Sequence, residues 1–172
     1  IADGSKLNGI YLATVILSTV VAAIGLLKNN STVIIGAMVI APFLGPNVAL
    51  ALSAILADYE LGKNGFKTLI TGVAAAFALA LAMGFLLPVG PATQEIASRT
   101  HASISDIILA MASGAAGVLA FTTGMSGTLI GVMVAVALLP PLTVSGLLLG
   151  ASHYNEAFFA FLLFMTNIIC IN

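Results

Sequence analysis

The stretch "VIIGAMVIAPFLGPNVALAL", from Val33 to Leu52, decides how this chain folds. It is apolar enough to cross a membrane, yet it carries Pro42, Gly45 and Pro46 where a membrane-spanning helix would be continuous. Proline removes one backbone donor and clashes with the carbonyl four residues earlier, so Pro42 would free the carbonyl of Met38. We therefore predict a helix that is broken inside an apolar segment.

The composition indicates that a lipid bilayer surrounds most of the chain. Of its 172 residues, 60% are hydrophobic and only 6% are charged, whereas soluble globular domains carry about 25% charged residues. The formal net charge of −1 gives no electrostatic reason to expect nucleic acid as a partner. A single cysteine, Cys170, excludes an intramolecular disulfide framework. We expect a multi-pass protein of the cell (inner) membrane.

Six apolar stretches have the length of membrane-spanning helices, because about 20 mostly apolar residues cross the hydrocarbon core. They cover approximately residues 9–27, 32–57, 66–88, 104–122, 127–151 and 157–172. The polar segments between them hold nearly all the charge. The sequence therefore predicts an all-α integral membrane protein with six transmembrane helices. Basic residues divide almost evenly between the two sides, which leaves the orientation open.

A second phrase, "TLIGVMVAVALLPPLTVSGLLL" from Thr128 to Leu149, matches the first when the sequence is shifted by 95 residues. Seven of the sixteen positions from Ser31 to Pro46 are identical in this register, and they include Ser, Gly, Met and Pro. Apolar sequence matches itself readily at Leu, Ile and Val, but matches of these other residues favour a duplication. Each unit would contain three spans, so the two halves would enter the membrane from opposite sides. We predict two inverted three-helix repeats, at residues 6–88 and 101–172, with broken second and fifth helices.

The matched breaks define a candidate site. Interrupted helices at corresponding positions of two inverted halves would face each other near the middle of the membrane, where transporters bind substrates. The predicted substrate-binding residues are Pro42, Gly45, Pro46, Asn47, Pro140, Pro141, Thr143 and Asp106. Freed carbonyls would attract a cation and helix N-termini an anion, so the sign of the ligand stays open. The alternative is that these prolines only kink the helices and aid packing.

Asp106 has two interpretations. It lies at the start of the fourth apolar stretch, and an acidic side chain inside a span is a candidate functional group. Ser103, three residues earlier, also fits a helix N-cap followed by an acidic first turn. In that case the carboxylate would only stabilise the helix start.

The short motif "GMSG", from Gly124 to Gly127, resembles the Gly-x-Ser-Gly of rhomboid intramembrane proteases. Such chemistry needs a histidine within hydrogen-bond reach of Ser126, and both His101 and His153 fall in predicted connections. We therefore expect no enzyme, no cofactor and no metal site.

Small residues at a spacing of four positions favour close helix packing. Examples are Gly127-x-x-x-Gly131 and Gly146-x-x-x-Gly150, which can serve contacts within the chain or between copies of it. We expect a homo-oligomer.

Three stretches carry a resemblance to a known family: "IIGAMVIAPFLGP" (34–46), "RTHASISDIILAMASGAAG" (99–117) and "GVMVAVALLPPL" (131–142). In these stretches the chain resembles uncharacterised bacterial and archaeal membrane proteins catalogued as domain-of-unknown-function family 389. Ala102 departs from that pattern, in which proline is expected. The resemblance implies a multi-span membrane domain joined to a soluble N-terminal region, and it supplies no substrate. We expect residues 1–172 to form a single transmembrane domain. Since residue 1 is Ile, we also expect the chain to be a piece of a longer protein.

Two functions follow as hypotheses. The first is passage of a small solute or ion, by a channel or a carrier, through a central site at the two broken helices. The second is a non-transporting membrane scaffold or sensor, in which the repeat only builds a stable bundle coupled to a soluble domain. A wet cavity between the two breaks would favour transport, whereas an interface filled by side chains would favour the scaffold.

Overall fold

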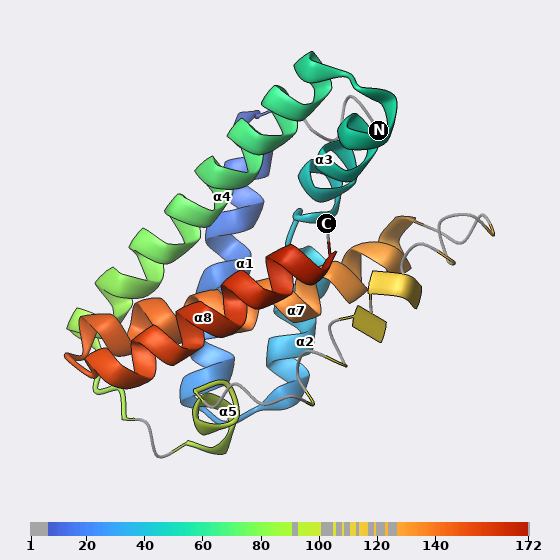
Figure 1. The fold of residues 1–172 in the computed structure, drawn as a ribbon. Coiled ribbons are helices and arrows are strands. Elements are labelled where there is room, and N and C mark those ends of the chain that lie inside the picture. The colour runs from blue at the N-terminus through green and yellow to red at the C-terminus, as the bar shows by residue number, and fades with distance from the viewer. Residues whose placement is uncertain are drawn as a thin grey trace.

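The computed structural model describes residues 7–90, 93–100 and 127–171, together with 105, 108, 111–112, 114–116, 119 and 123. For residues 127–136 and 171 it describes the backbone only. The elements with defined bounds are α1 (Gly9–Leu27), α2 (Ser31–Ile40), α3 (Leu44–Leu56), α4 (Tyr59–Leu86), α5 (Gln94–Ala97), α7 (Gly127–Gly150) and α8 (Tyr154–Ile171) (Figure 1). All regular structure in the described residues is helical, as predicted.

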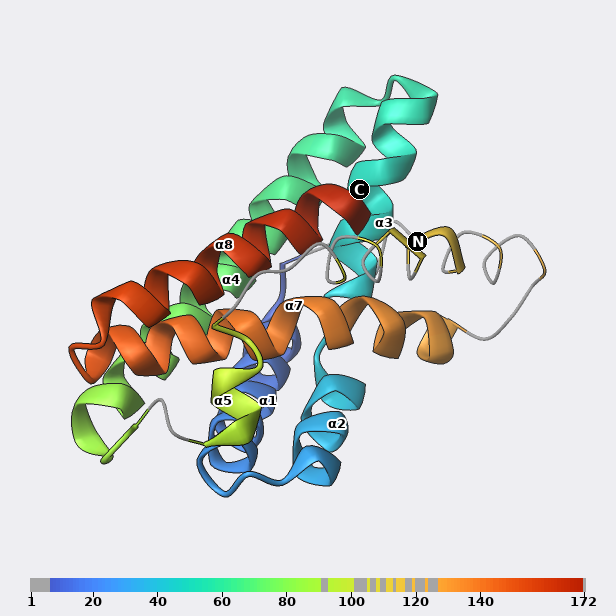
Figure 2. The same cartoon turned by 60° about the horizontal axis from the view of Figure 1, so that its bottom comes forward.

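Short polar turns join the helices into hairpins. Asn8, Asn30 and Asp58 are the N-caps of α1, α2 and α4, and each side chain accepts a hydrogen bond from a backbone N–H of the first turn. Such caps satisfy donors that have no partner inside the helix. The hairpins are α1–α2, α3–α4 and α7–α8, and the α7–α8 hairpin lies across α1 and α4 (Figures 1 and 2).

The core forms around α7, which contacts α1, α2, α3, α4 and α8. Its closest neighbour is α4, because glycines remove the side chains where the two helices cross. A Cβ added at Gly146 would lie 2.6 Å from the Cβ of Ala80, and one added at Gly84 would overlap the backbone carbonyl of Leu147. The predicted Gly146-x-x-x-Gly150 pair therefore packs inside the chain, against α4.

Two described helices, α1 and α4, are long and apolar enough to cross a membrane. The pair α2 and α3 qualifies together as one broken span, bent by 57°. The shorter apolar helices Ala137–Gly150 and Tyr154–Cys170 correspond to the predicted fifth and sixth spans. Most of the predicted fourth span, 104–122, lies outside the described residues, so the six-span inverted repeat stays a prediction.

The predicted break in the second span is present. Helix α2 ends at Ile40, and α3 begins at Leu44. Ala41, the residue before Pro42, is extended with φ −65° and ψ 121°, because proline disfavours a helical conformation in its predecessor. Pro46 falls in the first turn of α3, where a backbone N–H has no partner within the helix. Its missing donor therefore costs α3 nothing.

The predicted break in the fifth span is wrong. Helix α7 continues through Pro140 and Pro141. Proline at 141 cannot donate to the carbonyl of Ala137, but the side-chain Nδ2 of Asn167 on α8 donates to it at 2.8 Å. A neighbouring helix thus replaces the missing bond, which lets a proline-containing helix continue in apolar surroundings. The repeat also places Ala137, not a proline, opposite Pro42.

Candidate functional site at the helix break

The first wall of the predicted site lies at the junction of α2 and α3. Pro42 and Gly45 are half-buried there, whereas Pro46 and Asn47 are buried in the first turn of α3. The Asn47 side-chain Nδ2 donates to the carbonyl of Phe43 at 2.9 Å. This local bond stabilises the start of α3 by occupying a carbonyl beside the break.

The second wall lies on α7. Pro140, Pro141 and Thr143 are all buried. The Thr143 hydroxyl donates to the carbonyl of Leu139, four residues earlier, at 2.8 Å. Most hydroxyls in apolar helices are satisfied in this manner. Asp106 lies outside the described residues.

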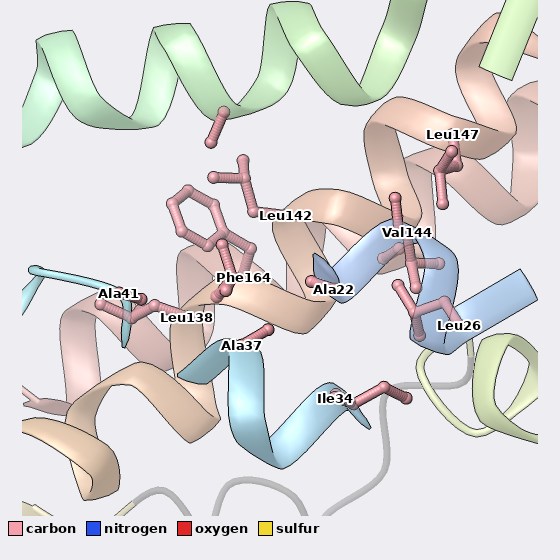
Figure 3. Close-up of a cluster of buried hydrophobic side chains, with 14 of the residues drawn as sticks. Ala22, Leu26, Ile34, Ala37, Ala41, Leu138, Leu142, Val144, Leu147 and Phe164 are labelled. Carbon is pink, nitrogen blue, oxygen red and sulfur yellow. The ribbon is translucent and has the colours of Figure 1, made fainter. Parts of the chain in front are cut away.

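Apolar side chains fill the interface between the break and α7. Ala41 and Phe43 from the break belong to one buried cluster with Leu138 and Leu142 of α7 and Phe164 of α8. Figure 3 shows Ala41 beside Leu138 and Phe164. Phe43 has 0% of its surface exposed. In the described residues the two walls therefore meet in direct contact, as expected for the scaffold hypothesis.

The other side of the break is more open. Pro42, Leu44 and Gly45 are half-buried, and Val39 and Ile40 at the end of α2 are exposed by 52% and 46%. The backbone between Ile40 and Leu44 is not helical, so it presents polar groups that a continuous helix would bond internally. A ligand reaching these groups would approach from the open side and not from α7.

One polar cluster outside the apolar helices fixes α5 to the α1–α2 turn. Glu95 bonds to the Ser31 hydroxyl and forms an ion pair with Arg99 at 2.7 Å. The Glu95 backbone N–H also donates to the Asn29 side chain at 2.9 Å. The Ser31 hydrogen bond, and next the Arg99 guanidinium, lower the pKa of the Glu95 carboxyl, while partial burial opposes them. This carboxylate is a structural anchor.

The role of Asn167 did not follow from the sequence. An amide in an apolar helix has many possible partners, and residue 167 lies 30 positions from Ala137. The signal was present, because the Pro140–Pro141 pair requires a donor from elsewhere and Asn167 is a strong donor in the following helix. Only the α7–α8 packing shows that the two meet.

Comparison with known proteins gives a family without an established activity. A family model described as "Domain of unknown function (DUF389)" matches residues 38–172. A protein of Methanocaldococcus jannaschii, described as uncharacterised, is 43% identical over 172 residues. That match covers 100% of the chain and 53% of the relative, so the chain spans about half the length of the curated relative it matches. No solved structure matches the chain significantly.

Proposed function

The chain belongs to the DUF389 family, and we propose that it passes a small solute or ion across a membrane. The observation that supports this function is the 57° break between α2 and α3 inside an apolar segment. In hydrocarbon, each unpaired backbone group costs several kcal/mol, so non-helical backbone occurs only where protein buries it or where it lines a wet cavity. Transporters use such discontinuous helices to bind their cargo.

The proposed path runs along the open side of the break. Ala41 and Phe43 anchor one side of this segment in the core, and Pro42 and Gly45 form the half-buried side. There, carbonyls at the end of α2 and N–H groups at the start of α3 provide partial charges of opposite sign. Leu138 and Leu142 of α7 belong to the same buried cluster as Ala41 and Phe43. Because both kinds of group occur at the break, neither the end of α2 nor the start of α3 determines whether the solute is positively or negatively charged.

The proposal includes the six-span architecture with two inverted halves in the cell (inner) membrane, assembled as a homo-oligomer. The repeat from Ser31 and Ser126 supports it, as do the long apolar helices α1 and α4. An odd number of spans in each half gives the two halves opposite orientations, the inverted-repeat arrangement of many transporters. No catalytic step, cofactor or metal belongs to this function.

A non-transporting membrane scaffold or sensor is the second candidate. The packed interface between the break and α7 favours it, because Phe43 and Leu142 are fully buried in one apolar cluster there. The polar side chains Asn47, Thr143 and Asn167 all bond to backbone carbonyls. In that role the bend would only shape the bundle, and a soluble part of the longer protein would carry the activity.

Solute flux into liposomes distinguishes the two candidates. The reconstituted chain is screened against inorganic ions and small metabolites, and the positive solute is measured again with Pro42→Ala. Alanine restores the N–H at the break and favours a continuous helix, so we expect flux to fall strongly. Gly36→Ala on α2 is the matched control, because a Cβ there meets nothing within 4 Å.

The outcomes separate the candidates clearly. Loss of flux in Pro42→Ala, with Gly36→Ala equal to the parent, supports passage at the break. Equal flux in all three proteins would reject the break as the path. Absence of flux for every solute, from protein shown to be folded, would favour the scaffold.

A further inference from the structure

We propose that a groove formed by α3, α4 and α8 binds one phospholipid with a zwitterionic, ethanolamine-type headgroup. This inference rests on membrane embedding, which is part of the proposed function, and is independent of solute passage. Figures 1 and 2 show the C-terminal end of α8 near α3, and residues of α3, α4 and α8 together line one pocket. The groove is separate from the break: neither Pro42 nor Phe43 lines it, and it meets the buried cluster only at Leu69 and Phe164.

Two adjoining pockets form the groove. One, of about 540 Å³, lies at the α3–α4 turn, and the other, of about 640 Å³, lies between α3, α4 and α8. They share Leu50, Ala54 and Phe66. Each volume is within the range of small-molecule sites, about 300–1,000 Å³. Because the pockets share lining residues, one elongated ligand can occupy both.

The two ends of the groove differ in polarity. Asp58, Tyr59 and Lys63 line the end at the α3–α4 turn. Only apolar side chains line the second pocket, among them Leu69, Val73 and Ile168. A ligand that fits this division has a charged head and a long hydrocarbon tail.

The position of the groove along α4 places its polar end at the membrane surface and its apolar end in the hydrocarbon core. The 28 residues of α4 give a length of about 42 Å at about 1.5 Å per residue, which exceeds the hydrocarbon core of about 30 Å. The charged residues Glu60, Lys63 and Lys67 all lie in its first three turns, and the helix from Thr68 onward carries no charge. The start of α4 therefore lies at headgroup depth, where Tyr59 is a typical interfacial side chain.

The charges at the polar end match a phosphate and an ammonium. Lys63 is exposed and makes no hydrogen bond or ion pair within the part of the chain that the structure describes, so its ammonium is free to bind a phosphate. Asp58 uses Oδ1 to accept from the Leu61 N–H at 3.0 Å. Its second carboxylate oxygen retains acceptor capacity for a primary ammonium. An anionic headgroup without an ammonium would instead meet the Asp58 carboxylate unfavourably.

Native mass spectrometry of the chain released from bilayers of defined composition tests the site. The probes are phosphatidylethanolamine, phosphatidylglycerol and phosphatidylcholine with identical acyl chains. We expect one phosphatidylethanolamine to be retained in preference to the other two. Lys63→Gln should reduce this retention about 1.4- to fivefold, the range for one exposed ion pair. Lys67→Gln is the matched control, because Lys67 is exposed one turn further along α4 and lines neither pocket.

Two further variants test the headgroup contact and the acyl-chain contact separately. Asp58→Asn removes the charge but keeps a good N-cap for α4, so the preference for ethanolamine over glycerol headgroups should be lost while the helix persists. Ala54→Trp fills the region shared by both pockets and should abolish retention of every lipid. Ala82→Trp is its control, since Ala82 is exposed on α4 outside the groove.

Several results would overturn the proposal. Equal retention in Ala54→Trp and Ala82→Trp would mean that lipid does not occupy the groove. Equal effects of Lys63→Gln and Lys67→Gln would reject the headgroup contact. If Ala54→Trp changes the monomer–dimer ratio without changing lipid retention, a second copy of the chain occupies the groove. None of these readouts uses solute flux, so failure of the lipid site and failure of the transport proposal are distinguishable.

Discussion

Replacing Asn167 by leucine should destabilise the bundle, because the carbonyl of Ala137 would lose its donor. The Asn167 amide donates to this oxygen at 2.8 Å, and proline at 141 cannot supply the usual helical N–H. Leucine has the same number and branching of side-chain heavy atoms as asparagine, so the change removes the hydrogen bond while keeping the shape of the side chain close to the original. A buried acceptor left without a partner costs about 1–3 kcal/mol, and side-chain bonds between membrane helices average about 0.6 kcal/mol. We expect a loss of about 1–2 kcal/mol in the free energy of unfolding.

A double-mutant cycle isolates this effect. Pro141→Ala gives residue 141 an N–H that can bond the Ala137 carbonyl within α7. In that background, Asn167→Leu should cost less than half of what it costs in the parent. The assay is reversible unfolding in mixed micelles, followed by circular dichroism. Asn155→Leu, at an exposed position near the start of α8, is the control and should change stability by less than about 0.5 kcal/mol.

One result of the cycle would contradict the proposed role of Asn167. If Asn167→Leu costs the same with proline or alanine at 141, then Asn167 does not replace the bond that the proline removes. The continuity of α7 would then need another explanation.

Further predictions concern the glycines and the polar anchor. Gly84→Ala would place a Cβ against the Leu147 carbonyl and should lower the free energy of unfolding by about 1–3 kcal/mol. Gly36→Ala should leave the free energy of unfolding equal or higher. Equal melting temperatures of the two variants would reject the close α4–α7 crossing. The lowered pKa of Glu95 means that α5 docking is strongest above the ordinary pKa of a glutamate and is lost as the pH falls through the lowered one. The hydrogen-exchange protection factors of α5, which are corrected for the intrinsic pH dependence of exchange, should therefore fall with acidification. Ser31→Ala should move this fall to higher pH, and an unchanged midpoint would contradict the role of Ser31.

The sequence predicted the helical class and the location of the first break. Pro42 alone predicted this break, because the residue before a proline avoids helical geometry. The apolar helices α2 and α3 lie on either side of it. Local rules of this kind act within a few residues, so sequence alone reveals them. The predicted residues Pro42, Gly45, Pro46 and Asn47 do lie together at that junction.

The second break could not be predicted correctly from the same rule. Pro140 and Pro141 remove donors just as Pro42 does, but their effect depends on whether another helix supplies a replacement. Asn167 does so from α8, and only tertiary packing brings it there. The same holds for the two walls of the site, since the sequence left open whether a cavity or packed side chains separate them, and Phe43 is buried at that interface. Side-chain volume at an interface is a property of the assembled bundle.

The accessibility of the break to water is the most direct test of passage at this site. Leu44→Cys and Leu17→Cys are each made in a Cys170→Ser background, reconstituted in liposomes and treated with a membrane-impermeant maleimide. Leu44 lies on the half-buried side of the break, whereas Leu17 is 60% exposed near the middle of α1, where lipid would cover it. We predict that Leu44→Cys reacts from the aqueous phase and that Leu17→Cys reacts only after detergent denaturation. If Leu44→Cys reacts no faster than Leu17→Cys, water does not reach the break, and passage of a solute along it is contradicted.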